Sequence, residues 1–411
     1  ANVLLIVGSM VFNFLVGKEL FRRSNKPLLV FSLAANLVLL GYYKYTDFLL
    51  SNVNLAFGTD VTLLHIALPL GISFFTFQQI GFLVDNYTKG VHDFKFVDYC
   101  LFVTFFPQLI AGPIVHHAEV MPQFGEARNR VLNYDNLAKG LLVFNMGLAK
   151  KLIIADNVAV IVSNGYKHAA QLGGADAWIT SLAYSVQLYF DFSGYSDMAI
   201  GLGLLFNIKI PLNFNSPYRA SNIQDFWRRW HMTLSRFLRD YIYIPLGGSK
   251  KGEWFTYRNL FITFLLGGIW HGAGWTFVLW GALHGGALII HRVFTKTGIF
   301  MPGWLGVIVT FLFVNFTWVF FKAPGWDVAM DMVAAMSGLQ DRAPGFTLIN
   351  DYYFLPIWVI AIVLLFRKNT QEQAESFTYN WKWLTIMVIL IVLNLIFLNS
   401  SISQEFLYFD F

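Results

Sequence analysis

The chain has 411 residues and a formal net charge of +5 at pH 7; 56% of its residues are hydrophobic and only 13% are charged. A soluble domain is about 45–50% apolar and about 25% charged. The composition therefore excludes an ordinary water-soluble protein, and because no DNA-binding motif is present we expect no nucleic-acid partner.

Apolar runs without a formal charge follow one another along the chain. Several reach the about 20 residues that a helix needs to cross about 30 Å of hydrocarbon. We therefore expect an all-α membrane protein with about nine to eleven membrane helices, some of them broken or re-entrant. The long runs are 1–17, 27–43, 61–84, 99–118, 259–291, 297–321, 352–366 and 383–404, and shorter candidates are 136–149, 152–166, 177–190 and 197–208.

No linker, charge run or internal repeat divides the sequence, so residues 1–411 are predicted to form a single membrane domain. The sequence begins at Ala1, and we expect the full protein to carry further N-terminal residues. Loops rich in Lys and Arg are predicted to face the cytoplasm, which places the C-terminal residues 405–411 on the outer side. These basic loops lie at 18–26, 150–151, 219–258 and 367–368.

Residues 105–124 read FFPQLIAGPIVHHAEVMPQF, in which three prolines and Gly112 interrupt an apolar run. This pattern predicts a broken or re-entrant segment. His116 and His117 invite a metal interpretation, but adjacent histidines do not share a helix face and no ligand pattern such as HExxH accompanies them. No metal site is predicted. Cys100 has no second cysteine to pair with, so an internal disulfide is excluded.

Residues 189–201 read YFDFSGYSDMAIG and place acidic and hydroxyl side chains between apolar segments. Buried carboxylates need partners. Asp191 and Asp197 are expected either to pair with Lys or Arg and fix helix register, or to orient a catalytic histidine or bind a hydroxylated acceptor. Asp191 and Ser193 are therefore candidate site residues.

Residues 225–248 read DFWRRWHMTLSRFLRDYIYIPLGG and are predicted to form an amphipathic helix at the cytoplasmic interface. On a helical wheel, Arg228, Arg229 and Arg236 lie on one side, while Trp227 and His231 lie on the aromatic face. The arginines either meet anionic lipid head groups or help to hold a phosphate-bearing cytoplasmic ligand. His231 is either a packing histidine or faces a site.

Residues 259–291 contain no formal charge, and as one straight helix they would be about 50 Å long. Because glycines surround His271, the run is predicted to break there, with His271 facing a cavity. An imidazole titrates near neutral pH and can act as a general base. The alternative is a neutral histidine bonded across helices, which we prefer for His284 and His291. Trp270, beside His271, is a further candidate site residue.

Five motifs of this chain resemble the membrane-bound O-acyltransferase family. Within that family they resemble the bacterial polysaccharide branch typified by the alginate O-acetyltransferase AlgI. The motifs are FWRRWHMTLSRFLRDYIYIPLGG (226–248), GGIWHGAGWTFVLWGALHG (267–285), FFPQLIAGPIVHHAEVMPQF (105–124), YFDFSGYSDMAIGLGLLFNI (189–208) and the terminal FLYFDF (406–411). The teichoic acid D-alanyl transferase branch shares the WRRWH and WHG elements, but YIYIPLGG resembles the alginate side more closely.

The resemblance implies a ring of helices around a central tunnel in the bacterial inner membrane. It implies that His271 is the catalytic histidine and His231 the second active-site position. It also implies that acetyl-CoA, or another cytoplasmic acetyl donor, is the substrate, with no bound cofactor, and that the acetyl group goes to an exported polysaccharide such as alginate, with periplasmic acetyltransferases as partners. His231 would orient the donor, donate to the developing oxyanion or steady His271.

Three other functions remain open on the sequence. D-alanyl transfer to teichoic acid would use the same motifs. A transporter or flippase would also use buried His and Asp residues, and a non-enzymatic scaffold of an export complex would need neither histidine.

Overall fold

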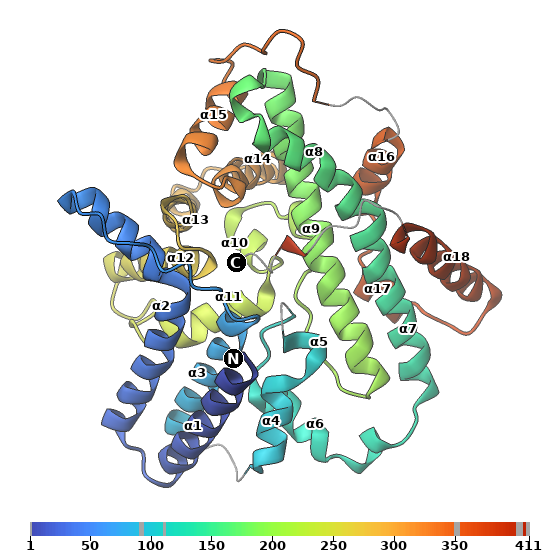
Figure 1. Cartoon of the computed structure of the whole chain (residues 1–411). Coiled ribbons are helices and arrows are strands. Elements are labelled where there is room, and N and C mark those ends of the chain that lie inside the picture. The colour runs from blue at the N-terminus through green and yellow to red at the C-terminus, as the bar shows by residue number, and fades with distance from the viewer. Residues whose placement is uncertain (1, 90–93, 110–111, 349–353, 400–405, 408–411) are drawn as a thin grey trace. The chain divides into compact units, whose positions relative to one another are not determined.

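The computed structural model describes the chain except residues 1, 90–93, 110–111, 349–353, 400–405 and 408–411 (Figure 1). The described residues form helices and connecting segments, without a β-strand. The α-helices are α1 (Asn2–Arg22), α2 (Lys26–Phe57), α3 (Ile72–Lys89), α4 (Phe96–Thr104), α5 (Phe106–Leu109), α6 (His117–Gly125), α7 (Tyr134–Ala149), α8 (Asp156–Lys167), α9 (Gly174–Leu205), α10 (Ile223–Trp227), α11 (Met232–Leu238), α12 (Glu253–His271), α13 (Trp275–Lys296), α14 (Gly303–Lys322), α15 (Trp326–Met336), α16 (Phe354–Leu365), α17 (Thr370–Glu375) and α18 (Trp381–Leu398). Short 3₁₀-helices are η1 (Ala127–Arg130), η3 (Ala169–Gln171) and η4 (Pro217–Arg219), and π-helical turns are η2 (Lys150–Ala155) and η5 (Arg239–Tyr243).

Within the described residues, five helices are long and apolar enough to cross a membrane. They are Val3–Arg22, Lys26–Phe57, Trp275–Lys296, Gly303–Lys322 and Trp381–Leu398. Many of their apolar side chains are exposed, as expected of helices in contact with lipid tails. The prediction of an all-α protein with several membrane helices is confirmed for the described residues. The full number of nine to eleven membrane helices stays a prediction.

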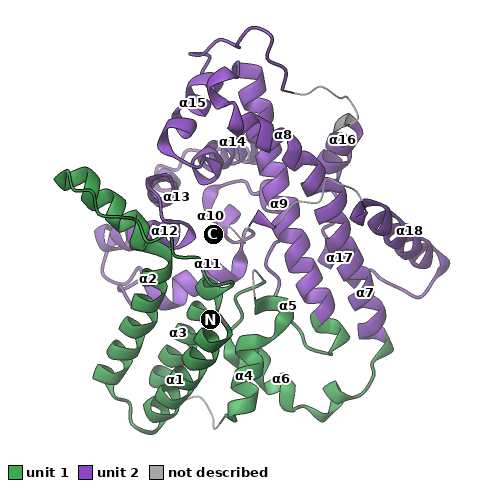
Figure 2. Ribbon diagram, in the orientation of Figure 1, with its two compact units in different colours: residues 1–134, 203–211 green, residues 135–202, 212–411 purple. Residues whose placement is uncertain are grey.

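The described chain divides into two compact units (Figure 2). The first comprises residues 1–134 and 203–211, and the second comprises 135–202 and 212–411. The single membrane domain over residues 1–411 stays a prediction.

In the first unit, helices α1, α2 and α3 share a buried polar cluster. Asn13 and Asn36 exchange hydrogen bonds of 2.7 and 3.0 Å between their amide groups. Ser9 and Asn13 both donate to Oε1 of Gln79, at 2.6 and 2.9 Å. Amides that bond across helices in this way need no water, so the cluster fixes how these three helices pack.

The segment 105–124 is broken as predicted. Helix α5 ends at Leu109 and α6 begins at His117, and residues 112–116 between them are not helical. Pro113 in this stretch has no backbone N–H to continue a helix, which accounts for the break. His117 is buried, with Nδ1 3.8 Å from Oδ2 of Asp85, and among the described residues no group of side chains is placed to hold a metal ion.

In the second unit, α12 and α13 form a hairpin whose helices pack through glycines. A Cβ atom on Gly268 would lie 2.9 Å from Cα of Gly281, and a Cβ on Gly281 would lie 2.5 Å from the carbonyl oxygen of Phe264. Only residues without a side chain allow two backbones to approach so closely. The uncharged run 259–291 is thus two helices that meet at His271, and the predicted break is confirmed.

The prediction of one continuous amphipathic helix over 225–248 is wrong. Helix α10 ends at Trp227, α11 begins at Met232, and His231 between them has a left-handed backbone with φ 42° and ψ 53°. A left-handed non-glycine residue costs about 1–2 kcal/mol, so other contacts must hold it there. The wheel that placed Arg228, Arg229 and Arg236 on one stripe therefore does not apply across residue 231.

Candidate active site

His271 is the last residue of α12. It is buried, and Gly272 follows it with an extended backbone. A Cβ atom on Gly272 would collide with the ring of Phe277, so a larger residue where the chain leaves the helix and turns into α13 would have to displace that ring. The histidine is thereby held at a fixed helix end rather than in the middle of a long helix.

Three aromatic rings from three helices surround the imidazole of His271 with edge-to-face geometry. The ring centroids of Trp270, Trp280 and Phe321 lie 4.9, 5.1 and 5.1 Å from that of the imidazole. Such rings supply van der Waals contact and a surrounding of low polarity. The candidate residue Trp270 is therefore a direct neighbour of His271.

His231 is fully buried in the turn between α10 and α11. The ring of Phe192 lies 4.7 Å from the imidazole, edge to face, and the ring of Phe214 stacks on it at 6.4 Å. His231 lies outside the five helices that are long enough to cross a membrane, and burial lowers its pKa well below the ordinary value. The imidazole is therefore neutral at physiological pH.

Asn213 forms hydrogen bonds to the turn that carries His231. Its Oδ1 lies 3.0 Å from Nδ1 of His231 and accepts hydrogen bonds from the backbone N–H and the hydroxyl of Thr233 at 3.3 and 2.9 Å. Its backbone oxygen accepts a hydrogen bond from the N–H of Met232 at 2.9 Å. Three consecutive residues of the turn thus bind one asparagine, which explains how the left-handed conformation is held.

Asn213 was not predicted as a site residue. It lies 18 positions before His231, in the stretch PLNFNS (211–216), where the chain has no helix or strand. The one signal in the sequence is a pair of asparagines, Asn213 and Asn215, in an uncharged segment between Pro211 and Pro217, because Asn side chains often bond to irregular backbone.

A row of packed aromatic side chains connects the surroundings of the two histidines within the second unit. Each ring in the row lies next to the following one, with centroids 5.0 to 6.4 Å apart. The row runs from His271 through Trp280, Trp318, Trp230 and Phe214 to His231. Both imidazoles are thus set in one continuous apolar core.

His284 has a different environment from these two histidines. The indole N–H of Trp227 donates to its Nδ1 at 3.2 Å, and its Nε2 lies 3.0 Å from the hydroxyl of Thr317. Both ring nitrogens are therefore engaged, which fits the packing role preferred for His284. The candidate site residue Trp227 is buried, and the one polar group of its side chain, the indole N–H, is engaged in this contact.

The three candidate phosphate-binding arginines occupy different positions. Arg228 follows α10 and is exposed, whereas Arg229 is half-buried and pairs with Asp225 at 2.8 Å. Arg236 is half-buried in α11, beyond the turn at His231. Arg228 is thus the member of this group best placed to meet a ligand from solution.

The acidic candidates on α9 pair with two consecutive lysines. Lys151 lies 2.7 Å from Asp191 and 2.8 Å from Asp156, and all three are buried. Lys150 lies 2.6 Å from Asp197. Both lysines stand in the π-helical turn η2 that joins α7 to α8. The lysine-pairing alternative describes both carboxylates, while a direct role of Asp191 in chemistry stays a prediction.

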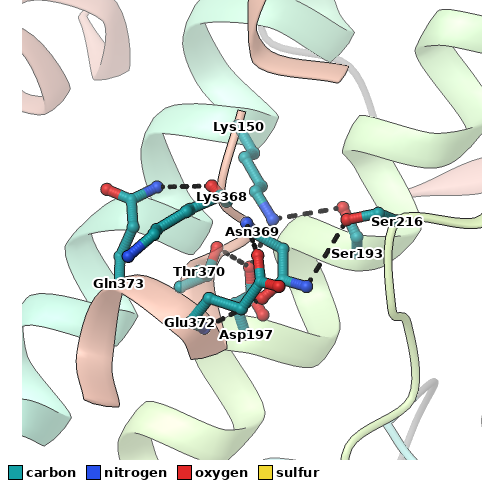
Figure 3. Close-up of polar contacts among 9 residues, drawn as sticks. All are labelled: Lys150, Ser193, Asp197, Ser216, Lys368, Asn369, Thr370, Glu372 and Gln373. Atoms are coloured by element: carbon teal, nitrogen blue, oxygen red, sulfur yellow. Dashed lines mark hydrogen bonds and ion pairs between the residues drawn. The ribbon is translucent and has the colours of Figure 1, made fainter. Parts of the chain in front are cut away.

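Figure 3 shows the polar contacts around Lys150. Its Nζ lies 3.5 Å from the hydroxyl of Ser193, and the hydroxyl of Thr370 donates to the same oxygen of Asp197 at 2.7 Å. The amide of Asn369 also reaches the hydroxyl of Ser216 at 3.4 Å. The candidate Ser193 thus belongs to a cluster that fastens the start of α17 to α9.

The chain is similar to proteins of one family of membrane-bound enzymes. The sequence profile of MBOAT, the membrane-bound O-acyltransferase family, matches residues 83–324. A peptidoglycan O-acetyltransferase of Helicobacter pylori is 45% identical over 99% of this chain and 87% of its own length. A "Probable alginate O-acetylase AlgI" of Pseudomonas aeruginosa is 42% identical over 81% of this chain and 66% of its own. A teichoic acid D-alanyltransferase of Bacillus subtilis is 31% identical over 62% of this chain and 68% of its own.

Proposed function

The chain belongs to the membrane-bound O-acyltransferase family, and we propose that it is an O-acetyltransferase of the bacterial inner membrane that acetylates an exported polysaccharide. The 45% identity with a peptidoglycan O-acetyltransferase over 99% of this chain supports the activity most directly. The relatives named for peptidoglycan and for alginate share one reaction, the transfer of an acetyl group to a sugar hydroxyl. Several apolar helices make it a multi-pass membrane protein.

His271 is the proposed general base. In transfer from a thioester, the acceptor hydroxyl gives its proton to the imidazole while its oxygen forms a bond to the acetyl carbonyl carbon. The carbon–sulfur bond then breaks, and the imidazolium returns the proton to the departing thiolate. The burial of His271 among Trp270, Trp280 and Phe321 supports this role, because a water-poor surrounding keeps hydrolysis from competing with transfer.

Acetyl-CoA is the proposed donor, used as a substrate with no bound cofactor. Arg228 is exposed at the end of α10, in a basic segment that the positive-inside rule places at the cytoplasm. A guanidinium there attracts the phosphates of CoA. Arg236, beyond His231, adds to the positive field, whereas Asp225 offsets the charge of Arg229. Donor and acceptor would then meet at the histidines from opposite sides of the membrane through a central tunnel.

The acceptor is proposed to be a polysaccharide outside the cytoplasm, reached directly or through a periplasmic acetyltransferase partner. Coverage of nearly the whole chain by the peptidoglycan relative favours a peptidoglycan glycan strand over alginate. D-alanyl transfer is the second candidate, supported by the lower identity of 31% with the teichoic acid enzyme.

The test is made on purified protein in lipid nanodiscs with radiolabelled acetyl-CoA and fragments of peptidoglycan or alginate. We expect label to move to the glycan and free CoA to appear in equal amount. Transport of a substrate without consumption of acetyl-CoA would overturn the proposal in favour of a transporter. A polymer that carries D-alanine, and no acetyl group, in cells that express the gene would select the second candidate.

A further inference from the structure

We propose that Asn213 is a positioning residue that holds the proton of His231 on Nδ1, so that Nε2 of this ring serves the active site as a hydrogen-bond acceptor. The assignment of the proton follows from contacts of the chain alone. Its consequence for catalysis rests on the proposed acetyltransferase function. The inference also removes one of the roles that the sequence left open for His231, which is donation to the oxyanion.

The orientation of the Asn213 amide is fixed by a neighbour that can only donate. The backbone N–H of Thr233 points to the amide atom that also faces His231, at 3.3 Å, so this atom is the oxygen Oδ1. The amide nitrogen lies on the other side, 3.2 Å from the hydroxyl of Ser196. A reversed amide would set two N–H donors against the N–H of Thr233.

An amide oxygen 3.0 Å from Nδ1 requires a hydrogen atom on that nitrogen. A neutral imidazole carries one N–H only, so Nε2 holds a lone pair. The depressed pKa of the buried ring supports the neutral form. Fixing a histidine tautomer through the hydrogen bond at its other nitrogen is a common way in which proteins define what the ring can do.

The tautomer excludes one role of His231, donation to the oxyanion. Stabilising the oxyanion of the acyl-transfer step needs an N–H aimed at the oxygen, and Nε2 has none in this state. A lone pair can instead accept a hydrogen bond from an O–H or N–H group. We therefore assign His231 to hold the acceptor hydroxyl or the N–H of a neighbouring group, and not to neutralise the oxyanion.

His284 provides an internal comparison in the same unit. The indole N–H of Trp227 faces its Nδ1 at 3.2 Å, so this nitrogen must accept and the proton is on Nε2, next to the hydroxyl of Thr317 at 3.0 Å. The two buried histidines thus have opposite tautomers. Each is set by a partner of definite polarity: an amide oxygen for His231 and an indole N–H for His284.

The direct test reads the tautomer without using turnover. Full-length protein labelled with ¹⁵N-histidine is examined by solid-state NMR in lipid bilayers, and the His231 signals are identified by their loss in His231→Gln. We expect Nδ1 to carry the proton and Nε2 to show the shift of an unprotonated nitrogen. A protonated Nε2 in the wild-type protein would overturn the inference even if the protein is an active acetyltransferase. An inactive protein with the expected tautomer would overturn the proposed function alone.

The kinetic test compares two substitutions of similar size. Asn213→Leu removes the acceptor and is expected to lower kcat by about tenfold or more, with the KM for acetyl-CoA changed by less than about twofold. Asn213→Asp keeps an acceptor oxygen, so it should retain most of kcat, while its charge favours imidazolium and moves the acidic limb of the pH profile to higher pH. Equal loss in both variants, with an unshifted pH profile in Asn213→Asp, would contradict positioning.

A matched control separates positioning from general loss of packing. Asn394 is another buried asparagine of the same unit, and its amide bonds to Asn145 on α7 at 3.0 and 3.2 Å. Asn394→Ala should lower thermal stability and leave the pH profile of kcat unchanged. If Asn213→Leu does not fold, as judged by gel filtration in detergent, the pH profile of Asn213→Asp and the wild-type NMR signals still decide the question.

Discussion

Gly268 and Gly281 bring α12 and α13 into backbone contact one helical turn before His271. A Cβ atom on Gly268 would lie 2.9 Å from Cα of Gly281, closer than real Cβ contacts allow. His271 follows three residues later at the helix end. The position of the proposed base therefore depends on two residues that have no side chain.

The substitution Gly268→Val should prevent the two helices from packing. The added carbons meet backbone, which cannot rotate away, so the loss of stability is expected to exceed the about 1–3 kcal/mol of ordinary overpacking. Gly286 on α13 is the matched control, because a Cβ atom there meets nothing within 4 Å. Gly286→Val should fold normally. The measurement is the yield of monodisperse protein after detergent extraction, and a normal yield of Gly268→Val would contradict the packing described here.

The buried group of Lys151, Asp191 and Asp156 yields a second prediction, which compares two variants. Lys151→Met removes the cation that faces both carboxylates, and such a break in a buried ion pair costs about 3–5 kcal/mol. Asp191→Asn leaves Lys151 beside Asp156 and should be milder. Thermal unfolding in detergent measures both. An Asp191→Asn protein with wild-type stability and no activity would instead assign Asp191 to the chemistry.

The sequence predicted the break at His271 because its signals are local: a run too long for one membrane crossing, with glycines on both sides of the histidine. It did not predict the turn at His231. A helical wheel assumes continuous helix, and the contacts that hold the left-handed residue come from Asn213, 18 positions away. Local pattern cannot report a conformation that a distant side chain stabilises.

The polar residues of α9 were predicted only in part. The sequence indicated that buried carboxylates need partners, and lysine pairing was one of two alternatives. It could not name the partners, because Lys150 and Lys151 face α9 from the π-helical turn η2. Two consecutive residues of a regular helix point about 100° apart. A sequence pattern therefore does not predict that two consecutive lysines both pair with carboxylates of the same helix.

The exposure of Arg228 predicts a specific effect on the donor. Arg228→Ala should raise the KM for acetyl-CoA by about threefold to tenfold with little change in kcat, because a surface cation contributes to attraction and not to bond breaking. High salt should reduce the difference between the variant and the wild type. Arg23→Ala is the control, since Arg23 is an exposed cation of another predicted cytoplasmic loop. An equal rise in KM in both variants would remove Arg228 from the donor site.

His271→Ala is expected to abolish acetyl transfer, with a loss of at least about 100-fold in kcat, because the hydroxyl then has no base to take its proton. The protein should still insert and fold, since His271 stands at the end of α12 and the glycine contacts between α12 and α13 remain. His168→Ala is the control: His168 follows α8, is half-buried and packs beside Phe346, and its loss should leave kcat unchanged. The assay follows radiolabelled acetyl-CoA and the glycan product, beside gel filtration of each variant. Retained transfer in His271→Ala would exclude His271 as the general base. If His271→Ala loses both transfer and folded protein, the same measurement is made on His271→Gln. Glutamine preserves more of the side-chain volume and hydrogen bonding than alanine but cannot take up the proton, so folded His271→Gln that still transfers acetyl groups would also exclude the role.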